Sequence, residues 1–150
     1  MKREETIDYT IKASWHAISR MYNQKAAKYG ITTSIAYVLL NISSSEGTPA
    51  TKIGPQIGLE SRSLTRMLKS LEEKGLIYRE KDPNDGRSVR VYLTEEGYRK
   101  KGIAIETVKA FNKYIYENIP IEKLKSFFEV INQVNNLIDN SHKLKDIIEN

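Results

Sequence analysis

The 150-residue sequence predicts a mainly α-helical protein that carries one small β-hairpin. Apolar residues recur at steps of three or four along both ends of the chain, which is the period of an amphipathic helix. Two short runs of strand-forming residues, 76–80 and 88–93, flank seven turn-forming residues, which is the pattern of a hairpin. Together these observations favour helices arranged around a small sheet.

The N-terminal region predicts two helices joined by a tight turn. The first runs from Glu4 to Lys28, and Gly30 is its stop. Thr32 or Thr33 caps the second helix, because either hydroxyl can accept a hydrogen bond from the exposed first-turn amides.

A loop over residues 43–49 precedes a short helix over 51–57, which ends at Gly58. Pro55 lies beyond the first turn of that helix, where proline removes a hydrogen bond. We therefore expect this helix to be short or partly 3₁₀.

A further helix spans residues 61–74, stops at Gly75 and leads directly into the hairpin. Thr94 then caps a long helix with an acidic first turn, which Pro120 interrupts. The last helix keeps its apolar period to about Asn140, after which the signal fades.

This order of elements predicts a winged helix-turn-helix lobe over residues 32–94. Residues 1–31 and 95–150 would form long N- and C-terminal helices whose apolar stripes one copy is unable to bury. Docking onto a second copy would cover those stripes, so we expect a homodimer with one intertwined domain per chain. Packing of the stripes within one chain is the alternative.

The composition excludes several classes of protein. The chain has no cysteine, which removes disulfides, thiolate metal sites and thiol chemistry. The longest apolar run, residues 35–40, is far shorter than a membrane span, and the N-terminus lacks the pattern of a signal peptide. With a net charge of +5, the sequence predicts a soluble, cytoplasmic, basic protein without membrane contact.

A local surplus of positive charge lies over residues 51–69, where Lys52, Arg62, Arg66 and Lys69 stand against Glu60 alone. At about 100° per residue, Arg62, Arg66 and Lys69 share one narrow face of the helix over 61–74, and the apolar residues face the other way. Arginine can form paired hydrogen bonds with guanine in the major groove, and short hydroxyls reach phosphates or base edges. The residues that we expect to face DNA from this helix are Ser61, Arg62, Ser63, Thr65, Arg66 and Lys69.

The hairpin brings a second set of cations, Arg87 and Arg90. The turn over residues 82–86 is rich in Asp and Asn, whose side chains stiffen a loop through hydrogen bonds to its own backbone. Such a loop can hold Arg87 in a minor groove, where the negative potential attracts guanidinium groups. A purely structural pairing of Asp85 with Arg87 or Arg90 is the alternative.

No motif for catalysis accompanies these features. The sequence has no phosphate-binding loop, nucleophile elbow, or paired nucleophile and histidine. Its two histidines, His16 and His142, are too far apart to form a metal motif. We therefore predict that the chain is not an enzyme and holds no metal or other cofactor.

Two blocks, residues 63–77 and 82–97, resemble the recognition helix and the wing signature of the MarR family of bacterial winged-helix transcriptional regulators. The second block carries Asp82, Asp85 and Arg87 at the spacing of that signature and ends in a Leu-Thr-Glu-Glu-Gly run. The order of the flanking helices fits as well, so the resemblance extends over nearly the whole chain.

The resemblance implies a homodimer on a near-palindromic duplex, with helix 61–74 in the major groove and wing 78–93 in the minor groove. It implies that Asp85 orients Arg87. It also implies that a small molecule, often an aromatic or phenolic acid, releases the DNA. Family pockets lie near the first two helices, which points to Trp15, His16 and Tyr37, although aromatic residues at helical spacing also occur as plain core.

The same charges would also permit two other functions. One is a non-specific architectural DNA-binding protein, and the other is a winged-helix module that binds proteins only. The cationic outer face of residues 61–69 counts against the second. Pro55 departs from the commonest family pattern, and the sequence does not distinguish repression from activation.

Overall fold

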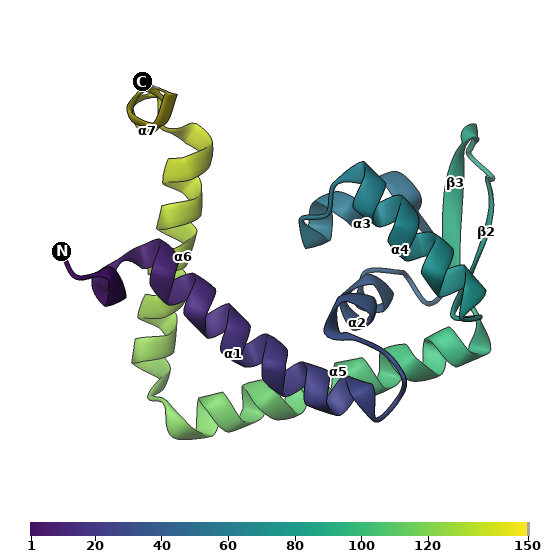
Figure 1. Ribbon diagram of the computed structural model, residues 1–150, viewed down its shortest axis with the longest axis horizontal. Helices are drawn as coiled ribbons and strands as arrows, with labels where there is room; N and C mark the ends of the chain where they lie inside the picture. The colour runs from purple at the N-terminus through teal and green to yellow at the C-terminus, as the bar shows by residue number, and fades with distance from the viewer. Residues whose placement is uncertain (150) are drawn as a thin grey trace. The chain divides into compact units, whose positions relative to one another are not determined.

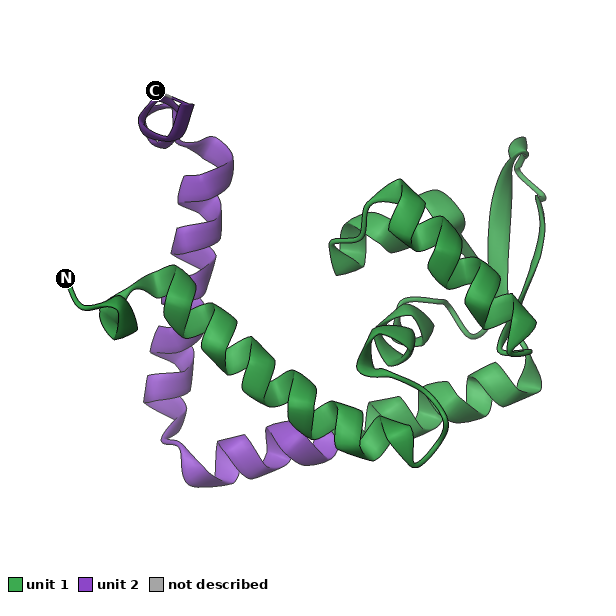
Figure 2. Ribbon diagram, in the orientation of Figure 1, with its two compact units in different colours: residues 1–108 green, residues 109–150 purple. Residues whose placement is uncertain are grey.

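The structure, a computed structural model, describes residues 1–149 (Figure 1). It divides into two compact units, residues 1–108 and residues 109–150 (Figure 2). The first unit contains η1 (Arg3–Glu5), α1 (Ile7–Ala27), α2 (Thr33–Leu40), β1 (Thr48–Pro49), α3 (Ala50–Ile57), α4 (Ser61–Glu73), β2 (Ile77–Asp82), β3 (Asp85–Leu93) and the start of α5 (Glu95–Asn118). The second contains the end of α5, α6 (Ile121–Asn140) and α7 (His142–Glu149).

The first predicted helix begins later than expected. Thr6 has extended backbone dihedrals and separates the 3₁₀ turn η1 from α1, so the prediction of one helix from Glu4 was wrong. The cap of α2 is Thr32, whose Oγ1 accepts a hydrogen bond from Ile35 N at 3.2 Å. Thr33 is buried instead and donates from its hydroxyl to Asn23 Oδ1 of α1 at 2.7 Å. The two threonines thus start α2 and join it to α1.

The helix-turn-helix consists of α3 and α4. The helix around Pro55 was expected to be short or partly 3₁₀; it is short, because α3 is an α-helix of only eight residues that contains the proline, and it has no 3₁₀ part. Proline leaves the Thr51 carbonyl without a helical partner, which a helix of two turns tolerates. Gly58 ends α3 with φ of 68°, a left-handed conformation that favours glycine, and the chain turns into α4 within three residues.

The sheet is antiparallel with the order β1-β3-β2. Its hairpin strands extend further toward the turn than predicted, because Asp82 and Asp85 still pair across a two-residue connection. The predicted loop over 43–49 was also incomplete, since Thr48 and Pro49 pair with Val91 and Arg90 as β1. That pairing joins the C-terminal part of β3 to the segment directly before α3.

One hydrophobic core stabilises the lobe. Its fully covered side chains come from α2, α3, α4 and the hairpin: Val38, Leu39, Ile42, Ile53, Leu71, Leu76, Ile77 and Val91. Gly97 lies against the Leu76 carbonyl so closely that a Cβ atom there would overlap the carbonyl oxygen. The close approach explains the glycine three residues after Thr94, where α5 leaves the hairpin.

The second unit is helical and exposes much of its apolar surface. Phe127 and Phe128 of α6 are about half exposed, and Ile138 is 54% exposed. Beyond Asn140, where the sequence signal faded, the structure adds the helix α7, and Ser141 Oγ accepts a hydrogen bond from Leu144 N in its first turn. Among the described residues, none of the helices is both long and apolar enough to cross a membrane.

Candidate nucleic-acid interface

The outer face of α4 carries the predicted cations. Arg62, Arg66 and Lys69 are exposed, and no ion pair joins any of them to another described residue. The opposite face is buried in the lobe through Leu64, Leu68 and Leu71. The 3.6-residue period therefore separates a packed side from a side whose charges are available to a ligand.

The hydroxyl groups of α4 differ in the hydrogen bonds that they can form with a ligand. Ser61, Ser63 and Thr65 are all exposed. Thr65 Oγ1 donates a hydrogen bond to the Ser61 carbonyl at 2.8 Å. While it holds that bond, the Thr65 hydroxyl can only accept, so it suits a base amino group better than a phosphate oxygen.

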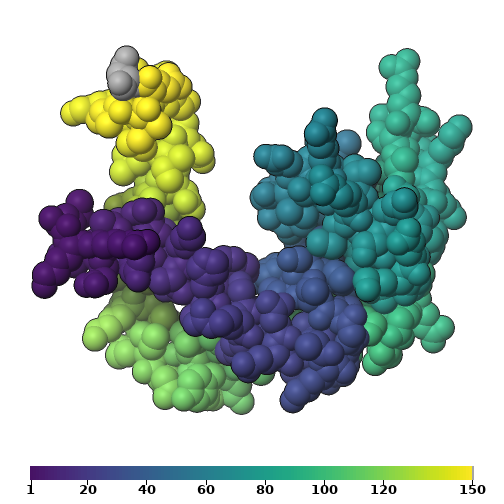
Figure 3. All heavy atoms as spheres, viewed as in Figure 1, coloured from purple at the N-terminus to yellow at the C-terminus, as the bar shows by residue number. Residues whose placement is uncertain are grey.

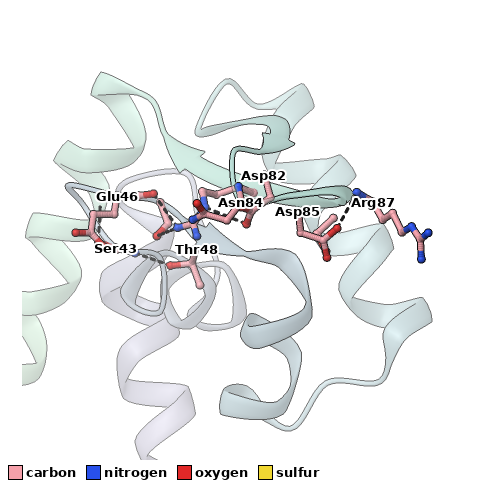
Figure 4. A network of polar contacts seen from close by, with 10 residues as sticks. Ser43, Glu46, Thr48, Asp82, Asn84, Asp85 and Arg87 are labelled. Atoms are coloured by element: carbon pink, nitrogen blue, oxygen red, sulfur yellow. Dashed lines mark hydrogen bonds and ion pairs between the residues drawn. The ribbon is translucent and has the colours of Figure 1, made fainter.

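Asp85 organises the tip of the hairpin. Its Oδ1 accepts from the backbone N–H of Arg87 at 3.0 Å and its Oδ2 accepts from Ser88 Oγ at 3.1 Å. The Arg87 guanidinium has no ion pair within residues 1–149 and extends away from the hairpin (Figure 4). Asp85 thus fixes the Arg87 backbone and leaves its charge free, and the hairpin projects from the lobe (Figure 3).

Arg90 occupies a different place from Arg87. Its Nε donates to Asp82 Oδ2 at 3.1 Å, and its Nη1 donates to the Glu46 carbonyl at 3.0 Å. The Arg90 side chain is only 17% exposed. The structure therefore does not bring the two predicted arginines together, because Arg90 ties β3 to the loop before β1.

The partner of Arg90 is Asp82, which belongs to the wing signature but whose pairing with Arg90 the sequence did not predict. Asp82 Oδ1 accepts from Asn84 N at 2.9 Å, and its side chain is 6% exposed. The hydrogen bond from Asn84, together with the nearby Arg90 charge, lowers the pKa of Asp82. An Asp two residues before an Asn in a turn was the available signal, because such a carboxylate often accepts the backbone N–H two residues on.

Two further residues missed by the sequence join α5 to the lobe. The ammonium groups of Lys100 and Lys101 donate to the carbonyls of Tyr29 and Ile42, which follow α1 and α2. Cations suit the ends of helices, where carbonyls lack partners. Burial lowers the pKa of Lys101. The partners lie 71 and 59 residues away, so no local pattern could have indicated them.

The three residues expected near a ligand do not share one site. The rings of Trp15 and Tyr37 lie 5.5 Å apart and line a hollow of about 540 Å³ between α1, α2 and the end of α3. Trp15 is 45% exposed, so it is not a core residue of this chain. His16 lines a separate hollow on another side of α1, together with Arg3, Lys12 and Arg20.

Tyr37 also lines a smaller apolar cavity of about 40 Å³. Its other lining residues come from α1, α2 and the first part of α5, among them Tyr22, Ala26, Leu40 and Ile103. Burial raises the pKa of both Tyr22 and Tyr37, which keeps these phenols neutral. No group of three metal-ligating side chains occurs in the described part of the chain.

Comparison with known proteins identifies the family of this chain. Residues 31–89 match the sequence model of the MarR family. The organic hydroperoxide resistance transcriptional regulator of Bacillus subtilis (strain 168) is 32% identical over 140 residues, which cover 90% of this chain and 95% of that protein. The chain belongs to the MarR family. It is a MarR-family transcriptional regulator, as the sequence predicted.

Solved structures share the MarR fold of this chain. The S. aureus MepR–DNA complex has a TM-score of 0.80 at 19% identity and covers 87% of this chain and 97% of MepR. The PcaV transcriptional regulator from Streptomyces coelicolor, in complex with its natural ligand, has a TM-score of 0.76 at 20% identity and covers 91% and 96%. The predicted class, mainly helical with a winged helix-turn-helix, is confirmed.

Proposed function

We propose that this MarR-family regulator binds a near-palindromic duplex as a homodimer, with α4 in the major groove and the hairpin tip in the adjoining minor groove. One observation supports this most strongly. Arg62, Arg66 and Lys69 of α4 and Arg87 of the hairpin are exposed and free of ion pairs within residues 1–149, although acidic residues flank them in the sequence. Exposed cations on neighbouring elements suit a polyanion.

The two elements would have different tasks. Arg62 and Arg66 would read base edges, since a guanidinium forms two parallel hydrogen bonds with guanine, and Lys69 with Ser61, Ser63 and Thr65 would position the helix on phosphates and bases. Arg87 would enter the minor groove, oriented through Asp85. Arg90, which is bonded to Asp82, would support the hairpin without contacting bases.

In this proposal, DNA binding and dimerisation belong to the two regions that the sequence predicted. Residues 32–94 would form the DNA-binding lobe, and residues 1–31 and 95–150 the dimerisation region. Ile7 and Ile11 of α1 and Phe127 and Phe128 of α6 are each about half exposed, a larger apolar surface than an isolated chain normally leaves in water. A twofold axis through such helices would set the two lobes on two half-sites.

A small aromatic acid would release the DNA by occupying the Trp15–Tyr37 hollow. The two rings offer a stacking surface, and the amides of Asn41 and Gln56 line the same hollow and can donate to a carboxylate. Because this hollow reaches Ile57 and Leu59 between α3 and α4, an occupant would shift the turn that aims α4. Without cysteine, oxidation of a thiol is not available as a signal. We propose a cytoplasmic location because the DNA lies there.

Selection of duplexes from a random pool tests the proposal. The native protein should enrich a sequence with two related half-sites, bind it at least about a thousandfold more tightly than a shuffled duplex, and release it when aromatic acids are added. Equal affinity for both duplexes with a steep salt dependence would indicate an architectural protein instead. No binding even at low salt would leave the protein-binding module as the better description.

A further inference from the structure

The helix α1 has two opposite faces of different chemistry. Relative to His16, the side chains of Lys12 and Arg20 lie within about 40° around the helix axis, and so does that of Tyr9. The apolar residues Ile7, Ile11 and Ile18 lie nearly opposite. The apolar face is the one proposed to meet a second subunit, so the cationic face requires a separate explanation.

The cationic face is concave. Arg3, Tyr9, Lys12, Ala13, His16 and Arg20 line a hollow of about 380 Å³, and no acidic residue is among them. The Arg3 guanidinium lies 5.1 Å from the centre of the Tyr9 ring, which holds it over the same hollow. Asp8, the acidic residue of the first turn of α1, projects about 80° away from His16.

These cations are not neutralised within the described residues. No ion pair joins Arg3, Lys12 or Arg20 to a carboxylate there. Lys12 and Arg20 stand one turn before and one turn after His16, so both ammonium and guanidinium groups lie on the face that lines the hollow. An anion seated between them would gain charge-assisted hydrogen bonds from both.

We propose that this basic hollow of α1 is a second ligand site, which binds a small molecule carrying two or more phosphate or carboxylate groups. Lys12 and Arg20 lie eight residues apart, about 12 Å along the helix, a spacing that suits two anionic groups of one molecule. The hollow has the size of a small-molecule pocket. In Figure 1 the start of α1 stands at the end of residues 1–108 away from the hairpin, which favours a small anion over the duplex held by α4.

Isothermal titration of the full chain with diphosphate, and separately with citrate, tests the site. We expect saturable binding of at least one of these probes, and the pair distinguishes phosphate from carboxylate chemistry. The double substitution Lys12→Gln and Arg20→Gln should weaken that binding at least about tenfold. The matched control, Lys28→Gln with Lys123→Gln, removes the same charge elsewhere and should change it less than about twofold.

The histidines provide an independent readout. The chain has only His16 and His142, so their ring signals in an NMR spectrum are simple to assign. The bound probe should shift the His16 signals and leave those of His142 in place. The absence of saturable binding, equal shifts at both histidines, or equal loss in the control variant would each overturn the proposal.

The same variants distinguish the proposed small anion from two other occupants of the basic hollow, DNA and a second subunit. If Lys12→Gln with Arg20→Gln weakens duplex binding more than the control does, the face contacts DNA and the proposal is wrong. If it converts a dimer into a monomer, the face meets a second subunit and the proposal is equally wrong. Duplex binding by the native protein, measured alongside, reports on the proposed function independently.

Discussion

The DNA-binding lobe and the helices at the two ends of the chain use their apolar residues in opposite ways. In the lobe, Val38, Leu39 and Leu71 are completely covered by the same chain. In α6, Phe127 and Ile138 are 55% and 54% exposed. The first region completes its own core, whereas the second presents an apolar surface that, in the proposed homodimer, another chain would cover. The stability of the two regions should therefore respond differently to protein concentration.

The largest effect is expected in the lobe. Leu71→Ala should lower the free energy of unfolding by about 3 kcal/mol, because it opens a cavity at a fully covered position. Unfolding in urea, followed by circular dichroism, measures the loss. The same loss should appear at low and high protein concentration, and a loss below about 1 kcal/mol would show that this core is not closed by one chain.

A charge introduced into the apolar face of the helices at the ends of the chain should weaken the association of two chains. Phe127→Asp puts a carboxylate in the exposed apolar face of α6, where a second chain would have to desolvate it, and should weaken dimerisation by about 2 kcal/mol. Sedimentation at micromolar concentration should show a shift from dimer to monomer. Asn136→Asp, nine residues on and therefore on the opposite side of α6, is the control and should leave the mass unchanged. An unchanged mass for both variants would remove the proposed role of this face.

Within the lobe, the helix and the hairpin should differ in their effect on DNA. Arg66→Ala should weaken binding to the selected duplex by about 1–3 kcal/mol and relax the preference at one base position. Arg87→Ala should weaken binding to all duplexes more evenly, because the minor groove distinguishes bases poorly. Fluorescence anisotropy with single-base variants of the duplex separates these outcomes, and Lys28→Ala serves as the control. The same profile from both arginine variants would contradict the assignment.

The smallest effect is expected at low pH, on the stability of the hairpin tip. Because the folded protein holds the pKa of Asp82 below its ordinary value of 3.8, the stability that this carboxylate contributes is present above that value and is lost as pH falls through the lowered pKa. The protection of the Asn84 amide against exchange, measured relative to the intrinsic rate at each pH, should then decrease. Asp82→Asn should remove this dependence and loosen the hairpin tip at neutral pH. An identical acid response in both proteins would assign it to another group, such as Glu96, whose pKa Arg99 lowers to about 2.

The lobe was more predictable from sequence than the contacts that support it. Local signals mark its elements: the helical period of α4, Gly58 after α3 and the turn formers of the hairpin. The bonds of Lys100 and Lys101 and the pairing of β1 with β3 join segments far apart in the chain, which no local pattern encodes. His16 follows Trp15 directly, yet adjacent helical residues project about 100° apart, so the structure assigns them to different hollows.

The central claim is that α4 and the hairpin tip bind two adjoining grooves of DNA. Its most direct test uses the fact that the chain has no cysteine. Asn84→Cys places one thiol at the exposed hairpin tip, where an attached hydroxyl-radical source can cleave bound DNA. On the selected duplex, cleavage should occur in the minor groove beside each half-site. The Arg66→Ala variant should protect no base position of that duplex beyond those that the native protein protects. Cleavage spread evenly along the duplex, or centred in the major groove, would contradict the account.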